Sequence, residues 1–280
     1  MERIVNYVDQ LNILAETDNA RAQCLLGKMY FLGKGVEQNF ERAFELFSKA
    51  TYGGDSDARY NLAMCCYYGL GTTQDYERAF FWLNSLTELK DVNVYRLLGI
   101  CHKKGYGVEA SMAKAMEYFQ KAADMGDTNS MCSIAYAYTK TIPPKLRQAF
   151  EYYERAAFLG CDKAQYNLAT FYLKGIYVSK NPSKAYEWFD ISAHNGNAQS
   201  QGVMGAYYLE PKHQNYKLAI SWLEKAAEQG DDKALYNLGN CYFFGKGKQV
   251  DMDKAYQLYK KSAEKGNILA MSRVAAMKKP

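Results

Sequence analysis

Small residues recur along the chain at a nearly constant interval, and each is followed four positions later by a large aliphatic residue. We call these small residues anchors; they are Ala22, Ala58, Val94, Ser130, Ala164, Ser200, Ala234 and Ala270. Successive anchors are 36, 36, 36, 34, 36, 34 and 36 residues apart. A fixed period of this length predicts a stack of helical hairpins, in which each unit buries its apolar faces against its neighbours.

Two helical patterns follow one another in every repeat. The first begins near the anchor and ends at a glycine turn such as the Gly33–Gly35 segment, because glycine adopts the positive φ that ends a helix. Glycine or alanine also stands five residues after each anchor, where a small residue lets two helices approach closely. The second helix carries an alanine with two bulky residues three and four places on, as in Ala43, Leu46 and Phe47, and closes on a glycine such as Gly54.

The pattern divides the chain into three parts. Residues 1–19 are predicted to form a capping helix with an apolar stripe, and residues 268–280 form the first helix of a partial repeat. The stripe of the capping helix consists of Ile4, Val5, Val8, Leu11, Leu14 and Ala15. The seven full repeats between them, residues 20–267, are expected at 20–55, 56–91, 92–127, 128–161, 162–197, 198–231 and 232–267.

The fourth and sixth repeats are two residues shorter than the others. The missing residues fall in the turn between the two helices, where Pro143, Pro144 and Pro211 replace the glycine pair. Proline fixes its own backbone and disfavours helix before it, so it is expected to break the chain there without glycine.

Charge and composition exclude several classes of function. The net charge is only +5, with basic and acidic residues interleaved, which does not indicate a nucleic-acid partner. No apolar run is long enough to insert into a membrane, and the N-terminus lacks the apolar core of a signal peptide. The seven cysteines are odd in number and lack a C-x-x-C pair. We therefore expect reduced thiols packed within helices, in preference to disulfides, and a cytoplasmic protein.

The sequence does not contain a recognisable catalytic or metal-binding motif. The three histidines are scattered, and each is expected to be a satisfied or exposed imidazole. The glycine pairs end helices rather than opening one after a strand, so they do not indicate a phosphate-binding loop. We expect no enzyme activity, no cofactor and no metal. The alternative, a cell-wall or β-lactam hydrolase, would need a catalytic constellation gathered from different repeats.

With this spacing, the chain resembles the Sel1-like repeat family, which is related to the tetratricopeptide repeats. The resemblance covers about residues 20–277 and is carried by Leu26-Gly27-x-x-Tyr30-x-x-Gly33-x-Gly35-Val36 and Ala122-Ala123-x-x-Gly126. It implies an all-α, right-handed α-α superhelical solenoid of about seven helical hairpins with terminal capping helices. It also implies a scaffold or adaptor that binds a protein or peptide partner in a concave groove.

By analogy with tetratricopeptide geometry, that groove is lined by the second, sixth and ninth residues after each anchor, beginning with Cys24, Lys28 and Phe31. We hypothesise that large or polar residues at the second and sixth positions contact an extended or helical peptide. Tyrosine and arginine support this hypothesis because they are typical of interface hot spots. These candidates are Tyr60, Arg96, Tyr136, Tyr166, Tyr236 and Asn240.

Two alternatives to this binding surface remain open. Tyr60, Tyr166 and Tyr236 share one register, so they also fit a role in packing between repeats. The asparagines that follow them, Asn61, Asn167 and Asn237, could bond a ligand or neighbouring backbone groups. A further alternative is homo-oligomerisation through the C-terminal end around Ile268, Leu269 and Val274, where an unpaired first helix leaves an apolar face open.

Overall fold

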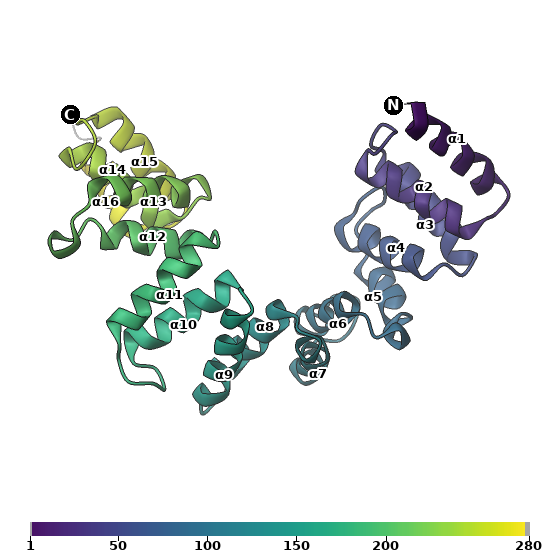
Figure 1. Cartoon of the computed structure of the whole chain (residues 1–280), viewed down its shortest axis with the longest axis horizontal. Helices are drawn as coiled ribbons and strands as arrows, with labels where there is room; N and C mark the ends of the chain where they lie inside the picture. Colours follow the sequence, from purple (N-terminus) through teal and green to yellow (C-terminus); the bar gives the residue numbers. More distant parts are fainter. Residues whose placement is uncertain (1, 278–280) are drawn as a thin grey trace. The chain divides into compact units, whose positions relative to one another are not determined.

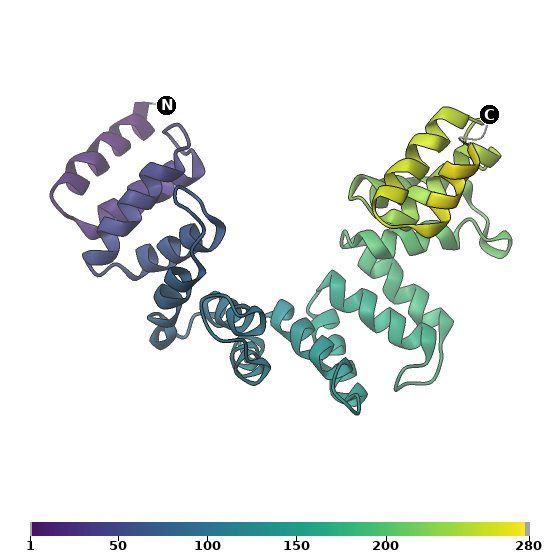
Figure 2. The same ribbon diagram turned by 180° about the vertical axis from the view of Figure 1, so that it is seen from behind.

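The computed structural model describes the backbone of residues 2–277 and the side chains of residues 7–277. Between residues 2 and 277 the chain forms sixteen α-helices and two short 3-10 helices, with no strand (Figures 1 and 2). It divides into two compact units, Met1–Ser130 and Met131–Pro280, and the division falls within α8.

The helices pair into hairpins along each unit. In the first unit, helix α1 is followed by three hairpins, and η1 follows α5: α1 (Glu2–Glu16), α2 (Ala20–Leu32), α3 (Phe40–Tyr52), α4 (Ser56–Tyr68), α5 (Tyr76–Asn84), η1 (Thr87–Leu89), α6 (Val92–Lys104) and α7 (Met112–Asp124). The second unit holds most of α8 (Thr128–Thr139), then α9 (Leu146–Phe158), α10 (Asp162–Lys174), α11 (Pro182–His194), α12 (Ala198–Tyr207), η2 (Pro211–His213), α13 (Tyr216–Glu228), α14 (Asp232–Phe244), α15 (Met252–Glu264) and α16 (Ile268–Met277). The predicted all-α stack of hairpins is confirmed, since first helices such as α4 and α14 pack on the second helix of their own repeat and on that of the repeat before.

The small residue five positions after an anchor leaves space for a large side chain of the second helix in the same hairpin. A Cβ added to Gly27 would lie 2.7 Å from the ring of Phe47, and one added to Gly99 would lie 2.6 Å from the ring of Phe119. Both rings are buried. Close helix packing therefore explains a mid-helix glycine that otherwise costs about 1 kcal/mol.

The glycine turns do more than end the first helix. Gly69 adopts a left-handed conformation as the C-cap of α4, as predicted. The second glycine, Gly71, also has a positive φ of 68°, and a Cβ there would overlap the carbonyl group of Phe40 in the preceding repeat. Gly107 meets the Tyr76 carbonyl in the same way. The turn thus packs directly against the previous hairpin, which the sequence pattern did not predict.

Helix α1 packs on the first hairpin through a narrower stripe than predicted. Val8 and Leu11 are buried against Leu26 and its neighbours, and Ala15 packs beside them. The prediction was wrong for Leu14, which is 46% exposed, because it is rotated by about 100° from Ala15 around the helix. The side chains of residues 4 and 5 lie outside the described part of the chain.

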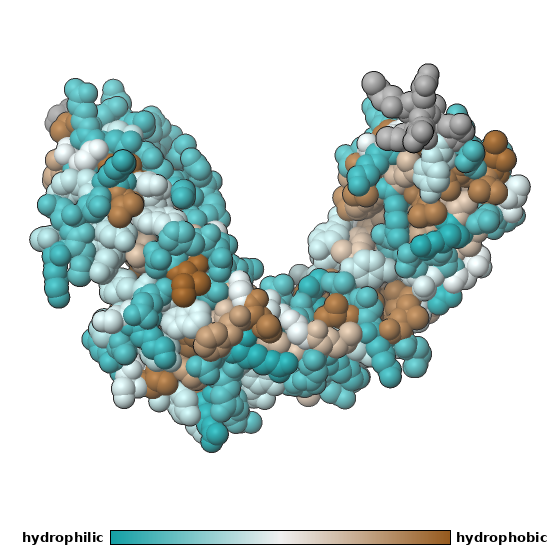
Figure 3. All heavy atoms as spheres, in the orientation of Figure 1, coloured by the Kyte–Doolittle hydropathy of each residue, from teal (hydrophilic) through white to brown (hydrophobic). Residues whose placement is uncertain are grey.

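None of the described helices combines the length and apolar character needed to cross a bilayer. On the face shown in Figure 3, hydrophobic residues form separate brown spots within a largely hydrophilic surface.

Candidate functional site

The second residue after an anchor lies beside the residue that caps the next first helix. Arg96 shows this contact: its Nη1 lies 3.1 Å from Oδ1 of Asp127, which also accepts a hydrogen bond from the backbone N–H of Ser130 at the start of α8. The Arg96 Nη2 donates to the side chain of Asn93 at 2.8 Å. The side chain of this predicted contact residue is therefore engaged with the residue that caps α8.

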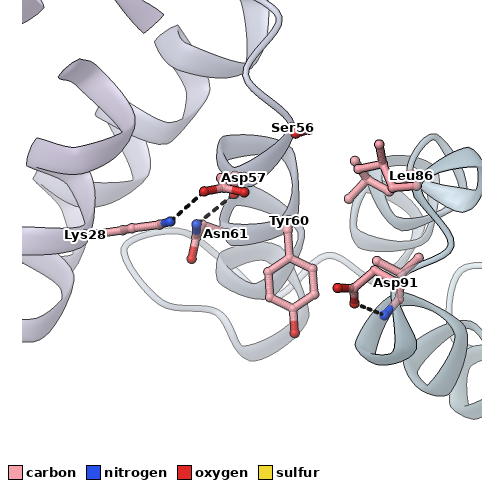
Figure 4. Close-up of a pocket in the computed structure, with 9 residues that line it drawn as sticks. Lys28, Ser56, Asp57, Tyr60, Asn61, Leu86 and Asp91 are labelled. Carbon is pink, nitrogen blue, oxygen red and sulfur yellow. Dashed lines mark hydrogen bonds and ion pairs between the residues drawn. The ribbon is translucent and has the colours of Figure 1, made fainter. Parts of the chain in front are cut away.

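A cleft of about 270 Å³, the α4–α6 cleft, lies beside Tyr60 in the first unit (Figure 4). Lys28 Nζ lies 3.0 Å from Oδ2 of Asp57, and the Asn61 side chain donates to the Asp57 carbonyl at 2.7 Å. The Tyr60 ring projects between this group and the segment that carries Leu86 and Asp91. The lining residues are Lys28, Ser56, Asp57, Tyr60, Asn61, Leu86, Leu89, Asp91 and Val94.

Two further clefts lie between first helices of the second unit. The α10–α14 cleft, of about 230 Å³, is lined by Tyr166, Gln199, Gly202, Val203, Ala206, Asp231, Asp232, Lys233 and Asn237. The α14–α16 cleft, of about 460 Å³, is lined by Asp232, Lys233, Tyr236, Asn237, Gly266, Asn267, Ile268 and Leu269. Each of the three clefts thus contains one tyrosine of the same register.

These tyrosines both pack against the hairpin and face a cleft. The ring centroid of Tyr166 lies 5.6 Å from that of Phe189, and the ring of Tyr236 lies 5.7 Å from Tyr259. Burial raises the pKa of Tyr60, and the charge of Arg96 opposes that rise. Among the described residues, none of the hydroxyl groups of Tyr60, Tyr166 and Tyr236 has a hydrogen-bond partner.

The other predicted contact residues lie in different surroundings. Tyr136 is 51% exposed, and the Lys140 ammonium lies 5.3 Å from its ring centroid. Asn240 accepts a hydrogen bond of 2.8 Å from the Tyr259 hydroxyl, so its side chain ties α14 to α15. The groove prediction was wrong for Cys24, which is fully buried because it packs within the cluster around Phe47.

Of the two roles considered for the asparagines that follow the tyrosines, a bond to a neighbouring backbone group is seen for Asn61 and Asn167. Asn61 and Asn167 donate to carbonyls one turn earlier in their own helices, at 2.7 and 2.8 Å. Asn237 lines both clefts of the second unit. The sequence analysis did not predict that the first turn of the next first helix would line these clefts.

A larger pocket, of about 550 Å³, lies between α11, α12 and η2, away from the tyrosine register. Its residues are Pro182, Ser183, Tyr186, Glu187, Asp190, Met204, Tyr207, Tyr208, Lys212 and His213. The shortened turn at Pro211 was the one sequence signal that could have located it. Tyr207 is held between neighbouring rings, since its centroid lies 4.3 Å from Tyr186 and 4.1 Å from His213.

The histidines pack against aromatic rings at three separate places. His102 is buried between Phe80 and Tyr118, and its Nδ1 has no hydrogen-bond partner. Burial lowers the pKa of His102, with a smaller contribution from Lys114. His194 contacts Trp222 at 4.9 Å between ring centroids.

Within the described residues, one group of side chains has the spacing of metal ligands: Cys24, Asp55 and Asp57. Arg21 and Lys28 already contact Asp57 at 2.9 and 3.0 Å, so two cations offset its charge. Burial raises the pKa of Cys24 to about 12, which keeps the thiol protonated at neutral pH. The donor set therefore does not fit a metal centre.

Curated relatives match only part of the chain, as two of them show. "DAP3-binding cell death enhancer 1" of Rattus norvegicus is 30% identical over 86 residues, which cover 31% of this chain and 17% of that protein. A Neisseria meningitidis protein described as uncharacterised is 30% identical over 95 residues, or 33% of this chain and 20% of its own length. The chain thus spans no more than about a fifth of the length of these two relatives.

Solved structures and a family model match far more of the chain. A protective antigen of uropathogenic Escherichia coli strains has a TM-score of 0.77 at 28% identity, covering 98% of this chain and 59% of that one. A Sel1 repeat protein from Oxalobacter formigenes has a TM-score of 0.77 at 27% identity, covering 97% and 80%. The Sel1 repeat model matches residues 20–55, 56–91, 94–127, 130–161, 162–197, 200–231 and 232–267. The chain belongs to the Sel1 repeat family.

Proposed function

We propose that this chain is a non-enzymatic interaction scaffold in which the first-helix face of each unit binds a peptide segment of a protein partner. Sel1 repeat proteins are generally protein-interaction scaffolds, which supports the class of function. The observation that carries the site is the recurrence of one arrangement: a cleft between first helices, with a half-buried tyrosine whose hydroxyl lacks a partner.

The tyrosines suit peptide recognition for two reasons. Their rings are held by packing, as Tyr166 is by Phe189, so little side-chain entropy is lost when a partner binds. Their hydroxyls are left to bond the carbonyl or amide groups that an extended or helical peptide presents. Clefts of about 230 to 460 Å³ fit individual side chains of such a peptide.

The other predicted contact residues, Tyr136, Arg96 and Asn240, have supporting roles in this proposal. Tyr136 offers an exposed ring beside Lys140 on α8. Arg96 and Asn240 already bond Asp127 and Tyr259, so we assign them to shaping the surface around the clefts.

Substitution of Tyr166 and Tyr236 by phenylalanine tests the proposal, because it removes the hydroxyls and keeps the rings. Peptides would be selected from a displayed random library on the wild-type protein, and their affinities measured by fluorescence anisotropy. We expect each lost hydroxyl to weaken binding about 5-fold, and the Tyr166→Ala/Tyr236→Ala double variant to weaken it further.

The matched control is Tyr52→Ala on the second helix α3, where the side chain is 81% exposed. Its affinity should equal that of the wild type, and circular dichroism should show that all variants keep their helices. Peptides that bind the tyrosine variants and the wild type equally would place the binding surface elsewhere.

Two finer assignments accompany the proposal. We place the protein in the cytoplasm, because five of its seven cysteines are buried as small helix residues without a disulfide bond. The cell-wall or β-lactam hydrolase gains no support, since the imidazoles of His102, His194 and His213 each pack against an aromatic ring.

Self-association is a second candidate, and the surface of α16 favours it. Ile268 is 76% exposed, Leu269 is 60% exposed and Met271 is 46% exposed, and the first two line the α14–α16 cleft. A cluster of exposed apolar side chains on one helix is typical of a contact surface.

A further inference from the structure

The residue that precedes each first helix normally caps it. Its side-chain oxygen accepts a hydrogen bond of 2.8 to 3.1 Å from the backbone N–H of the anchor. The capping residues are Asn19, Asp55, Asp91, Asp127, Asn197, Asp231 and Asn267. Among the described first helices, α10 alone begins without such a bond, because Cys161 stands at its N-cap. Cysteine cannot replace this cap, so the position loses helix stability.

The residue that faces this N-cap is also a cysteine. Cys132 lies two residues after its anchor, at the register where Arg96 meets Asp127 in the repeat before. Its Sγ is 3.7 Å from Sγ of Cys161. At this boundary, two thiols in contact therefore occupy the positions where other boundaries have a hydrogen-bonded helix cap.

Exposure separates these two thiols from the rest. Cys132 and Cys161 are partly exposed, whereas the other five cysteines are buried. Packing alone thus does not account for a thiol at both positions.

We propose that Cys132 and Cys161 form an oxidative modification site, at which hydrogen peroxide converts the facing thiols into a disulfide that joins α8 to the N-cap of α10. A disulfide has an S–S bond of about 2 Å, so the sulfurs must approach by only about 2 Å. Rotation of the two short side chains, with small shifts of the loop before α10, covers that distance.

The two sulfurs have different roles in the reaction. Cys161 lies at the N-terminus of α10, where the helix dipole stabilises a thiolate. The hydrogen bond to Cys161 and then burial raise the pKa of Cys132. We therefore assign Cys161 as the attacking thiol and Cys132 as the resolving thiol.

The chemistry balances with peroxide as the two-electron oxidant. The Cys161 thiolate attacks one peroxide oxygen, an S–O bond forms as the O–O bond breaks, and the leaving hydroxide takes up the thiol proton as water. Cys132 sulfur then attacks the sulfenic sulfur, an S–S bond forms as the S–O bond breaks, and the second hydroxide leaves as water with the Cys132 proton. One peroxide oxidises two thiols and yields two waters.

Counting alkylated thiols on the intact chain tests this proposal. The protein is reduced with dithiothreitol, treated with hydrogen peroxide, unfolded and alkylated, and its mass is measured. We expect seven alkylated cysteines before oxidation and five after it, with a peptide map that joins Cys132 to Cys161. A second dithiothreitol treatment should restore all seven.

Variants make the test specific. Cys132→Ser and Cys161→Ser should each abolish the loss of two thiols, and Cys161→Ser is expected to fold because serine is a favoured N-cap. The control Cys24→Ser should still lose two thiols, because Cys24 lies in a different repeat. Retention of every thiol, a cross-link between two molecules, or accumulation of sulfinic acid on Cys161 would overturn the proposal.

A second measurement distinguishes the effect of the N-cap on the unfolding temperature from the effect of the disulfide. Cys161→Asn installs the side chain used at α2, α12 and α16, so the reduced variant should unfold a few degrees above the reduced wild type. Peroxide should leave the unfolding temperature of this variant unchanged and raise that of the wild type. An equal response of both proteins to peroxide would contradict a disulfide at this boundary.

Discussion

The second residue after the anchor serves more than one purpose among the repeats although its backbone position is the same. Arg96 forms an ion pair there, Tyr60 lines a cleft, and Gly202 leaves the α10–α14 cleft open. Since the helices hold these positions at fixed spacing, a substitution changes the local chemistry without changing the hairpin. Individual residues can therefore diversify the surface while the stack is kept.

His102 makes the stability of the third repeat depend on pH. Its pKa is lowered in the folded state by burial, so the imidazole stays neutral there while the unfolded chain takes up a proton below about pH 6.5. The unfolding free energy should therefore fall as the pH drops through 6.5, until the folded-state pKa is reached. Urea unfolding at pH 7.5 and pH 5.5 measures this loss.

His102→Tyr removes this titrating group and installs the residue found at the same position in five other repeats. The difference in urea midpoint between the two pH values should be smaller in the variant than in the wild type. His194 and His213 are present in both proteins and cancel in the comparison. An unchanged difference would mean that the His102 imidazole titrates normally when folded.

At the level of elements, the turns carry the contacts between hairpins. Gly71 and Gly107 lie against carbonyl groups of the preceding second helix, so each glycine turn is also a packing surface. The shortened turns lack the glycine pair, and η2 at Pro211–His213 builds one wall of the pocket between α11, α12 and η2. A change of turn thus changes the surface on that edge of the second unit.

Comparison of Gly71→Ala with Gly54→Ala isolates this packing. Both glycines have a positive φ, which costs alanine about 1 kcal/mol. Only at Gly71 would the new Cβ also meet the Phe40 backbone, whereas nothing lies within 4 Å at Gly54. We expect Gly71→Ala to lower the unfolding free energy by about 2 kcal/mol more than Gly54→Ala. Equal losses, measured by urea unfolding, would show that the turn is free to shift.

The helices and the tyrosine register were predictable from local periodicity. Residues equivalent to Gly27 and Tyr60 stand at the same positions in other hairpins. The sequence analysis wrongly placed the exposed Leu14 in the apolar stripe of α1, because spacing alone does not define where that stripe ends. Contacts between repeats were harder to foresee. The neighbours of Gly71 and Cys132 are about 30 residues away, and their approach depends on the angle between hairpins, which spacing does not encode.

At the scale of the whole molecule, the proposal of self-association concerns the exposed apolar side chains of α16. If its apolar surface mediates self-association, the wild-type mass in light scattering should rise with concentration. Ile268→Lys/Leu269→Lys should stay at the monomer mass, because two charges cannot be buried in such a contact. The control Ile142→Lys, at a residue 99% exposed in the α8–α9 turn, should behave as the wild type. A monomeric wild type at every concentration would exclude this contact.

The pairing between the second residue after an anchor and the N-cap residue of the next first helix restricts how such an array can be rearranged. If the hairpin of α6 and α7 were followed directly by α10 with its N-cap residue Cys161, the Arg96 guanidinium would lose its carboxylate and the Cys161 thiol its partner. Hairpins of equal length are therefore not interchangeable at these two boundaries, since each boundary needs a match between a first helix and the N-cap residue of the next first helix. Duplication or loss of a repeat would be tolerated most readily where the joined boundary restores such a match.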